Sequence, residues 1–279
     1  MREHGGNLDV AQRRFGGPVE DWIDLSTGIN RVPYPDVGVE PRQWNALPSR
    51  SDIESLHHAA RQAYGTGAPI VAIGGAQAAI QLLPNLVSRG RARILAPTYN
   101  EYAGVLSAAG WDVDEVSELA ALAGADIAVV VNPNNPDGQR HDRGELLALL
   151  PRVGRLVIDE SFADAVPGIS LAAEAGRAGL LILRSFGKFY GLAGLRLGFA
   201  VGSEPDIAAL AAMAAAAIAR GAAGWLDGAA AVAVGSVAVA AATGTASAAP
   251  AVAVLDASGC GTACVVALSP AGCVSLLDF

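Results

Sequence analysis

Short apolar runs recur between residues 70 and 201, and several of them end in a glycine, proline, asparagine or aspartate. The run Ile127–Val131 is almost entirely β-branched, as expected of a strand buried on both faces. Strands that alternate with helical stretches predict an α/β fold: a mostly parallel sheet with helices on both faces and a ligand site at the carboxyl ends of the strands. The predicted strands are Ile70–Ile73, Ala92–Ala96, Trp111–Val116, Ile127–Val131, Leu156–Ile158, Leu180–Leu183 and Arg196–Val201.

The segments before the first of these strands carry clear boundary signals. The spacing of apolar residues predicts a helix over Ser51–Tyr64, with Ser51 as its cap, Glu54 in the capping-box position and Gly65 after its end. The first 50 residues are rich in glycine, proline and charge, so they predict an irregular arm. Within it, Ile23–Leu25 favours a short strand.

One lysine occurs in the chain. The other 18 of the 19 basic residues are arginine, and only Lys188 can lose a proton and act as an amine nucleophile. Covalent chemistry with an aldehyde or ketone is therefore one interpretation of Lys188. A solvated surface lysine is the other, and the residue alone does not decide between them.

The neighbours of Lys188 favour the chemical interpretation. Ser185 lies three residues before it and Arg196 eight residues after it, and a guanidinium suits phosphate oxygens. Upstream, a strand runs into Gly74–Gly75 and then into a helix that begins near Ala76–Gln77. That arrangement presents backbone N–H groups to a phosphate. An amine beside a phosphate-binding cup is what pyridoxal 5′-phosphate requires, so Gly75, Ala76, Gln77, Ser185, Lys188 and Arg196 are candidate cofactor-binding residues.

Polar residues follow three other predicted strands. Tyr99 stands after the strand that ends at Ala96, where it could stack on a flat ring, although packing at a helix start explains it equally well. Asn135 lies in the stiff turn 132–138, and its amide could donate to a ring oxygen. Asp159 follows a buried strand, where a carboxylate is costly unless it is paired.

With these residues the chain resembles the class I/II aminotransferase family of fold-type I pyridoxal-phosphate enzymes. The resemblance rests on S-x-x-K with an arginine eight residues later, and on the turn N-P-N-N-P-D-G, in which Asp137 replaces the threonine usual in the family. It implies that Lys188 and Asp159 are catalytic, and that Asp159 pairs with the protonated pyridine nitrogen. Phe162 stands where many members carry a tyrosine, so only Asn135 would hold the ring oxygen.

Within that family, H-G-G-N at residues 4–7 and I-D-L-S-T-G-I-N at residues 23–30 are similar to the threonine-phosphate decarboxylase branch of cobalamin biosynthesis. This resemblance implies decarboxylation of L-threonine O-3-phosphate to (R)-1-aminopropan-2-yl phosphate, with His4, Asn7 and Asn30 on the substrate side. An aminotransferase acting on histidinol phosphate or a similar compound is the alternative. Leu47 disfavours it, because those enzymes usually carry a tyrosine there. The resemblance further implies a homodimer.

The resemblance covers roughly residues 4–207. It suggests an arm or part of a small domain over residues 1–48 and a large pyridoxal-phosphate-binding domain over residues 49–207. Residues 208–279 form a tail rich in Ala, Val and Gly in place of the usual small domain, which would be incomplete or aberrant. Residues 221–279 contain no arginine for a substrate carboxylate. A diverged small domain or a shifted reading frame from about Met213 would explain the tail, and an inactive family remnant is a further alternative.

Net charge and cysteine positions bear on partners and location. A net charge of −8 without a basic stripe argues against a nucleic-acid partner. Cys260, Cys264 and Cys273 lie near the end without a nearby histidine, so we expect no metal site. The start of the chain lacks the apolar segment of a signal peptide, and residues 229–243 are too short and too weakly apolar for a membrane span. We therefore expect a cytoplasmic protein.

Overall fold

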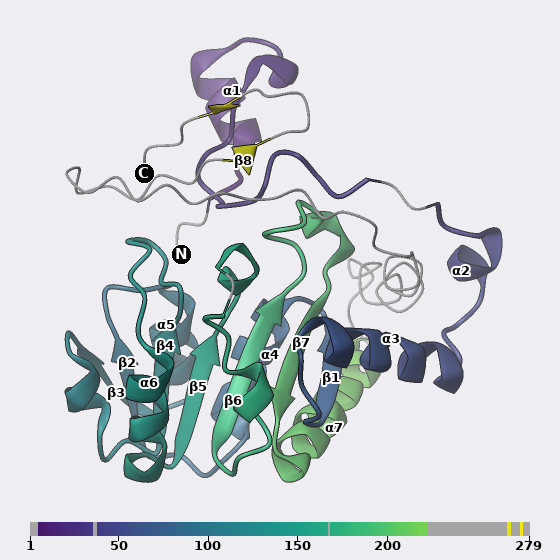
Figure 1. Ribbon diagram of the computed structural model, residues 1–279. Coiled ribbons are helices and arrows are strands. Elements are labelled where there is room, and N and C mark those ends of the chain that lie inside the picture. The colour runs from purple at the N-terminus through teal and green to yellow at the C-terminus, as the bar shows by residue number, and fades with distance from the viewer. Residues whose placement is uncertain (1–4, 36–37, 167, 222–266, 269–273, 276–279) are drawn as a thin grey trace.

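The computed structural model describes residues 5–35, 38–166, 168–221, 267–268 and 274–275. Its main feature is a seven-stranded sheet in the order β1-β7-β6-β5-β4-β2-β3, drawn in Figure 1. The strands are β1 (Ile70–Ile73), β2 (Arg91–Leu95), β3 (Asp112–Val116), β4 (Ile127–Val131), β5 (Arg155–Asp159), β6 (Leu180–Ser185) and β7 (Gly198–Gly202). The predicted strands of the sheet are all present.

The sheet is mixed but mostly parallel, which confirms the predicted fold class. Strands β3, β2, β4, β5 and β6 pair in parallel, whereas β7 runs antiparallel to both of its neighbours, β6 and β1. Because β7 runs the opposite way, its first residue lies at the same edge as the last residues of β1 and β6. Gly198 pairs with Ile73 on one side and with Ser185 on the other.

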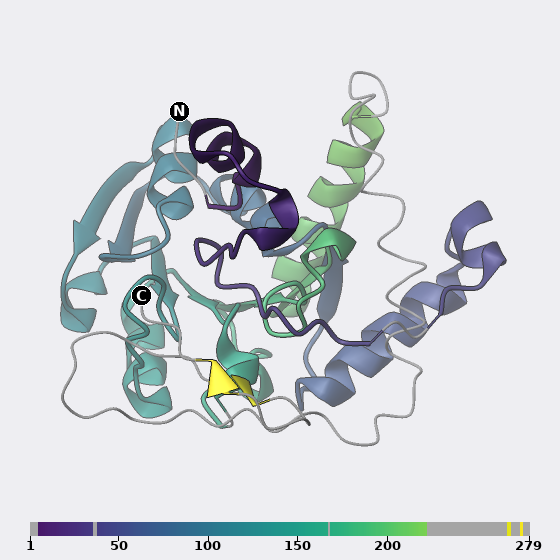
Figure 2. The ribbon, with the colours of Figure 1, turned by 90° about the horizontal axis from the view of Figure 1, so that it is seen from above.

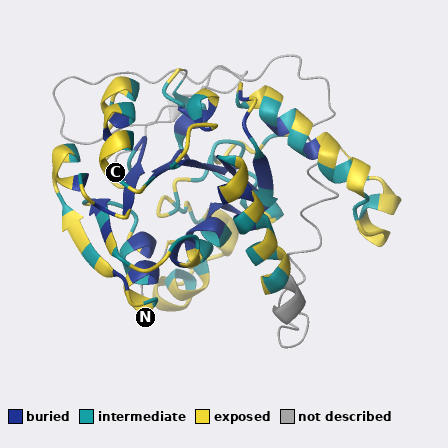
Figure 3. Ribbon diagram, turned by 90° about the horizontal axis from the view of Figure 1, so that it is seen from below, coloured by how far each residue is buried: buried dark blue, intermediate teal, exposed yellow. Residues whose placement is uncertain are grey.

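Helices cover both faces of the sheet, as predicted, and Figure 2 shows the two layers from above. One apolar cluster contains residues of α3 (Arg50–Ala63) and α6 (Arg143–Leu149) with one face of the strands. The other contains residues of α4 (Ala76–Leu82), α5 (Glu101–Ala108) and α7 (Glu204–Gly221) with the opposite face. In Figure 3 the central strands are mostly buried, and β4, β6 and β7 are buried along their whole length, as continuous apolar runs require.

The N-terminal arm contains more structure than its composition predicts. It forms α1 (Leu8–Phe15) and α2 (Pro41–Asn45), two short helices that the sequence analysis does not predict. The predicted strand at Ile23–Leu25 is wrong. These residues pair with no strand, and Ile23 is 60% exposed. Figure 1 shows the arm passing above the edge where β5 and β6 end.

Several predicted boundaries move for local physical reasons. Helix α3 is capped by Ser49 rather than Ser51. The Ser49 hydroxyl accepts a hydrogen bond from the Asp52 backbone N–H at 3.2 Å, and the Asp52 carboxylate accepts one from the Ser49 N–H at 2.8 Å. Strand β7 begins at Gly198 rather than at Arg196, because Arg196 has φ 49°, a left-handed conformation that no strand contains.

The first turns of the expected tail pack against the sheet. Ile207 and Leu210 of α7 are buried in the apolar cluster on that face of the sheet, so α7 crosses the expected boundary at residue 208 without a break. Beyond residue 221 only the two-residue strands β8 (Ala267–Leu268) and β9 (Val274–Ser275) are described. The expected incomplete or aberrant small domain lies largely outside the described residues, and so do the three cysteines. Among the described helices, none combines the length and the apolar character that crossing a bilayer demands.

Candidate active site

The sheet edge at which β4, β5 and β6 end gathers most of the predicted site residues. Asp159 is the last residue of β5, Ser185 is the last residue of β6, and Lys188 follows three residues later. Arg196 is the residue that precedes Leu197 and β7, and Gly75 follows β1. The strand order, rather than the order along the chain, brings these residues to one place.

Asp159 is buried, with 3% of its surface exposed, and both of its carboxylate oxygens have donors. The Tyr102 hydroxyl donates to Oδ2 at 2.6 Å, and the Ser161 backbone N–H donates to Oδ1 at 2.9 Å. These two hydrogen bonds offset the desolvation of the charge and fix the carboxylate plane at the end of the strand.

Lys188 lies in a partly buried position close to two charged groups. Its Nζ donates a hydrogen bond to the Thr27 carbonyl at 2.9 Å and lies 5.9 Å from the centre of the Phe162 ring. Burial lowers the pKa of the Lys188 amine, the Asp159 charge opposes that shift, and the Arg196 charge adds to it. The amine is therefore within electrostatic range of both Asp159 and Arg196, and burial makes its neutral, nucleophilic form easier to reach.

The Arg196 guanidinium lies directly over the Gly75 turn. A Cβ atom added at Gly75, where φ is 77°, would stand 3.2 Å from Nη2 of Arg196. Gly198 closes the turn from the other side. A Cβ there would stand 2.5 Å from the Ala76 nitrogen and 2.7 Å from the Gly75 carbonyl carbon. Glycine at both positions lets a guanidinium, a backbone turn and a strand end approach one another as a small cradle.

Gln77 and Tyr99 meet beside this cradle. The Tyr99 hydroxyl donates to the Gln77 side-chain oxygen at 3.1 Å, and the Gln77 amide donates to the buried Glu101 carboxylate at 2.9 Å. The Tyr99 ring contacts Tyr102 edge to face, with centroids 6.5 Å apart and an interplanar angle of 83°. Tyr99, the side chain expected to stack on the cofactor ring, is thus held by Gln77 at its hydroxyl and by Tyr102 at its ring.

The structure does not bring every candidate into this group. Asn135 lies at the same edge, in the turn after β4, and is exposed. Asn7 caps α1, where its side-chain oxygen accepts a hydrogen bond from the Val10 N–H at 3.3 Å. His4 lies outside the described residues. Asn30 is close to Lys188, but its amide donates to the Phe189 carbonyl at 2.9 Å, so it holds the lysine loop.

The arm contacts the lysine loop at further points. The Asn30 backbone N–H donates to the Lys188 carbonyl at 3.0 Å, and the Tyr34 N–H donates to the Tyr190 carbonyl at 2.7 Å. A Cβ at Gly191 would meet the Asn30 carbonyl oxygen at 2.6 Å. The segment 27–34 therefore packs tightly along the lysine loop.

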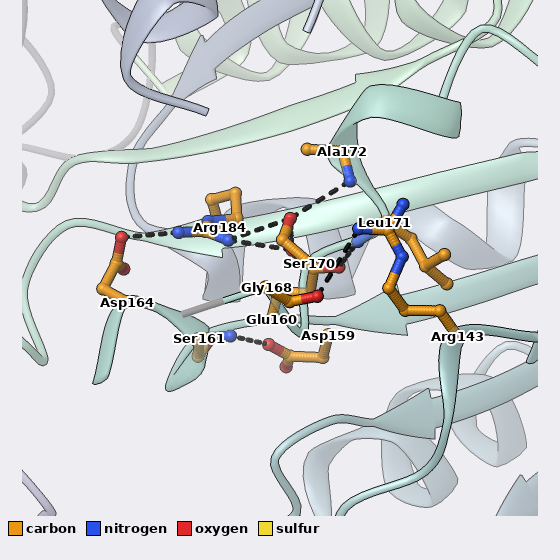
Figure 4. Close-up of polar contacts among 10 residues, drawn as sticks. All are labelled: Arg143, Asp159, Glu160, Ser161, Asp164, Gly168, Ser170, Leu171, Ala172 and Arg184. Atoms are coloured by element: carbon orange, nitrogen blue, oxygen red, sulfur yellow. Dashed lines mark hydrogen bonds and ion pairs between the residues drawn. The ribbon is translucent and has the colours of Figure 1, made fainter. Parts of the chain in front are cut away.

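A buried ionic cluster beneath this loop was missed by the sequence reasoning. It consists of Arg184, Glu160, Asp164 and Ser170, shown in Figure 4. Arg184 is 4% exposed, donates to Glu160 at 2.8 Å and also pairs with Asp164, while the Ser170 hydroxyl donates to Glu160. Burial raises the pKa of Glu160 and of Asp164, and the Arg184 charge opposes both shifts. Pairing with β7 carries β6 to Ser185, two residues beyond the predicted end, and these ion pairs offset the burial of the Arg184 charge within the strand.

Two further polar residues, Asn134 and Asp137, form hydrogen bonds that hold the loops around the site. Asn134 accepts a hydrogen bond from the Thr98 hydroxyl at 2.6 Å and donates to the Pro97 carbonyl at 2.9 Å, so it links the loops after β2 and β4. Asp137 accepts from Asn134 at 2.7 Å and from the Gln139 N–H at 3.0 Å, which keeps the turn closed where the family has threonine. The N-P-N-N-P-D-G run was the available signal for Asn134. For Tyr102 the only signal in the sequence was its position three residues after Tyr99.

These residues fit pyridoxal phosphate. The partly buried lysine, the doubly hydrogen-bonded carboxylate, and the cradle of Arg196 and Gly75 are the groups that its aldehyde, pyridine nitrogen and phosphate call for. Among the described residues, no group of three or more His, Cys, Asp or Glu side chains is placed to hold a metal ion.

Comparison with known proteins gives the family to which the chain belongs. Residues 20–249 match the family model described as aminotransferase class I and II. A threonine-phosphate decarboxylase from Sinorhizobium sp is 46% identical over 216 residues, and one from Pseudomonas aeruginosa is 45% identical over 218 residues. The alignments cover 75% and 76% of this chain, and the chain spans 65% of the length of each of these relatives.

A second group of relatives is less similar. A histidinol-phosphate aminotransferase from Mycobacterium bovis is 40% identical over 173 residues, covering 58% of this chain and 47% of the relative. Among solved structures, L-threonine-O-3-phosphate decarboxylase from Porphyromonas gingivalis matches with a TM-score of 0.59 and 24% identity, covering 72% of this chain and 63% of that one. Aspartate aminotransferase from Thermus thermophilus matches with a TM-score of 0.67 and 20% identity, covering 85% of this chain and 68% of that one. These structures establish the fold.

Proposed function

Since the chain belongs to the aminotransferase class I and II family, whose cofactor is pyridoxal 5′-phosphate, we propose that it decarboxylates L-threonine O-3-phosphate to (R)-1-aminopropan-2-yl phosphate. That reaction would place it in cobalamin biosynthesis, as expected from the sequence. The observation that carries the choice of reaction is the 46% and 45% identity to threonine-phosphate decarboxylases, against 40% over a shorter stretch for a histidinol-phosphate aminotransferase.

The side chains around Lys188 would divide the work. Arg196, the Gly75–Gln77 turn and Ser185 would bind the phosphate of the cofactor, because a guanidinium and free N–H groups suit phosphate oxygens. Asp159 would hold the proton on the pyridine nitrogen, Tyr99 would stack on the ring, and Asn135 would donate to the ring oxygen. When bound, pyridoxal phosphate supplies an electron sink for the pair left at Cα after carbon dioxide departs.

Lys188 is the group that we propose returns a proton to Cα. Its amine is partly buried, and its pKa is lowered, so it can exchange a proton more readily than a solvated lysine. Phe162, which lies near the Lys188 amine, has no hydroxyl that could take part in this proton transfer. The substrate-side roles of His4, Asn7 and Asn30 stay predictions.

A product assay on the whole purified chain tests this proposal. With pyridoxal phosphate and L-threonine O-3-phosphate, we expect trapped carbon dioxide and one equivalent of 1-aminopropan-2-yl phosphate. Amine transfer from histidinol phosphate to a 2-oxo acid without carbon dioxide would favour the aminotransferase alternative. A chain that binds the cofactor but performs neither reaction would be the inactive remnant, and the proposed decarboxylation would be wrong.

We also propose a homodimer, and the N-terminal arm supports it. The large, strongly exposed apolar side chains found in the described part of the chain all lie between residues 10 and 47, with Leu47 79% exposed and Phe15 69% exposed. Exposed apolar side chains concentrated in one segment favour a contact of that segment with another protein surface. Light scattering should give twice the chain mass of 28.2 kDa, and a monomer at micromolar concentration would refute the proposal.

Two other expectations remain proposals. The cytoplasmic location stays a prediction from the sequence. The shifted-frame origin of the tail from about Met213 is tested by translating the other frames of the gene. A frame that continues the family pattern would support it, and the absence of such a frame would exclude it.

A further inference from the structure

Tyr102 is a buried side chain whose hydroxyl contacts Asp159, and the reaction proposed above gives it no role. It is the second residue of α5, its side chain is fully buried, and its ring belongs to the apolar cluster formed by α4, α5 and α7 with the sheet. Its hydroxyl donates to Oδ2 of Asp159 at 2.6 Å. The bond joins a helix after β2 to the end of β5, across 57 residues of chain.

The two donors to Asp159 have different origins. Ser161 lies two residues further along and donates its backbone N–H to Oδ1, so this bond forms within one turn of chain. A carboxylate held at one oxygen alone can still rotate about its side-chain bonds. The Tyr102 hydroxyl is the tertiary contact that holds the second oxygen and thereby sets the orientation of the carboxylate.

Tyr102 is suited to remain a donor. Burial raises its pKa well above the ordinary value, and the neighbouring Asp159 charge and hydrogen bond raise it further. The hydroxyl therefore keeps its proton in neutral and moderately alkaline solution. The edge-to-face contact with Tyr99 fixes the ring, so the hydroxyl has little freedom to turn away from Asp159.

We propose that Tyr102 is a positioning residue, which orients the Asp159 carboxylate toward the pyridine nitrogen through its hydroxyl and steadies the Tyr99 ring through its edge. This inference rests on the proposed function, because Asp159 needs the orientation only if it binds the cofactor ring. A residue with this role affects both how tightly the cofactor binds and how fast the bound substrate reacts.

Tyr102→Phe removes the hydroxyl and keeps the ring. We expect the dissociation constant for pyridoxal phosphate, measured by absorbance titration, to rise about tenfold, which corresponds to about 1.4 kcal/mol. With saturating cofactor, kcat for threonine phosphate should fall by a larger factor than KM changes, since the substrate does not contact Tyr102. The matched control is Tyr64→Phe, a partly buried tyrosine packed on the apolar cluster of the opposite face that contacts Arg184 and not Asp159. Its cofactor affinity should be unchanged.

A double-mutant cycle separates positioning from packing. In an Asp159→Ala background the additional effect of Tyr102→Phe on cofactor affinity should shrink to less than twofold, because the hydroxyl has lost its acceptor. A full tenfold effect in that background would show that Tyr102 acts by packing and would overturn the inference. An unchanged affinity of the Tyr102→Phe variant for pyridoxal phosphate would also overturn the inference. A wild-type chain that binds no cofactor would overturn the proposed function itself, and this inference with it.

Discussion

Gly198 offers the sharpest test of how the cradle is built. Strand β7 approaches the turn after β1 and the end of β6 at this residue. A Cβ there would stand 2.5 Å from the Ala76 nitrogen and 2.8 Å from the Arg184 carbonyl oxygen. Both atoms are backbone and belong to buried elements, so neither can rotate out of the way. Gly198→Ala must therefore displace a strand or the turn.

The size of the effect follows from these contacts. Overpacking a well-packed interior costs about 1–3 kcal/mol, and distances below 3.0 Å to backbone place this substitution at the upper end. A loss of about 3 kcal/mol corresponds to a fall of about 6–12 °C in Tm for a domain of 150–250 residues. Urea unfolding of the apo chain measures the same loss as a lower midpoint with an unchanged slope.

Gly194→Ala is the matched control from the same loop. A Cβ at Gly194 would meet no heavy atom within 4 Å, and the residue lies in the short helix Ala193–Leu195. Its stability should stay within about 0.5 kcal/mol of wild type or rise slightly. Because Gly198 braces the turn beneath Arg196, Gly198→Ala should also weaken pyridoxal-phosphate binding, whereas Gly194→Ala should not. A loss below about 1 kcal/mol for Gly198→Ala would refute the overpacking argument.

Three further predictions follow from the other charged and titratable groups. Replacing Lys188 by Ala, or by Arg to keep the charge, should abolish the visible absorbance band that pyridoxal phosphate gives with the wild-type chain, and survival of the band would contradict the role of that amine. Arg184→Met leaves two buried carboxylates without their cation and should cost about 3–5 kcal/mol in urea unfolding, against less than about 1 kcal/mol for the exposed Arg177→Met; equal losses would disprove the argument. Burial lowers the pKa of His57, which accepts a backbone hydrogen bond from β1, so below pH 6.5 the unfolded chain binds more protons and stability should fall as the pH decreases. His57→Leu should reduce that dependence below pH 6.5 and the exposed His58→Leu should not, and identical pH profiles would exclude His57 as the source.

The sequence predicted the sheet well because burial on both faces leaves a strong local signal. Continuous apolar runs such as Ile127–Val131 appear as β4 with the same bounds, and the polar turns after them lie at the predicted edge. The lone Lys188 and the motifs around it led to the family that the comparisons confirm. Short segments that bury no residue gave weaker signals. Helices α1 and α2 were therefore missed, and Ile23–Leu25 was wrongly predicted as a strand.

Residue types and their spacing were enough to nominate Lys188, Asp159 and Arg196, because an amine, a carboxylate and a guanidinium carry their chemistry with them. The contacts between those groups depend on residues far apart in sequence, and only the tertiary structure decided them. The hydroxyl of Tyr102 meets Asp159 across 57 residues, and Gly198 packs against Ala76 because β7 is inserted between β1 and β6. No local pattern encodes such pairings, since the strand order and the packing of the helices onto the sheet set which side chains meet.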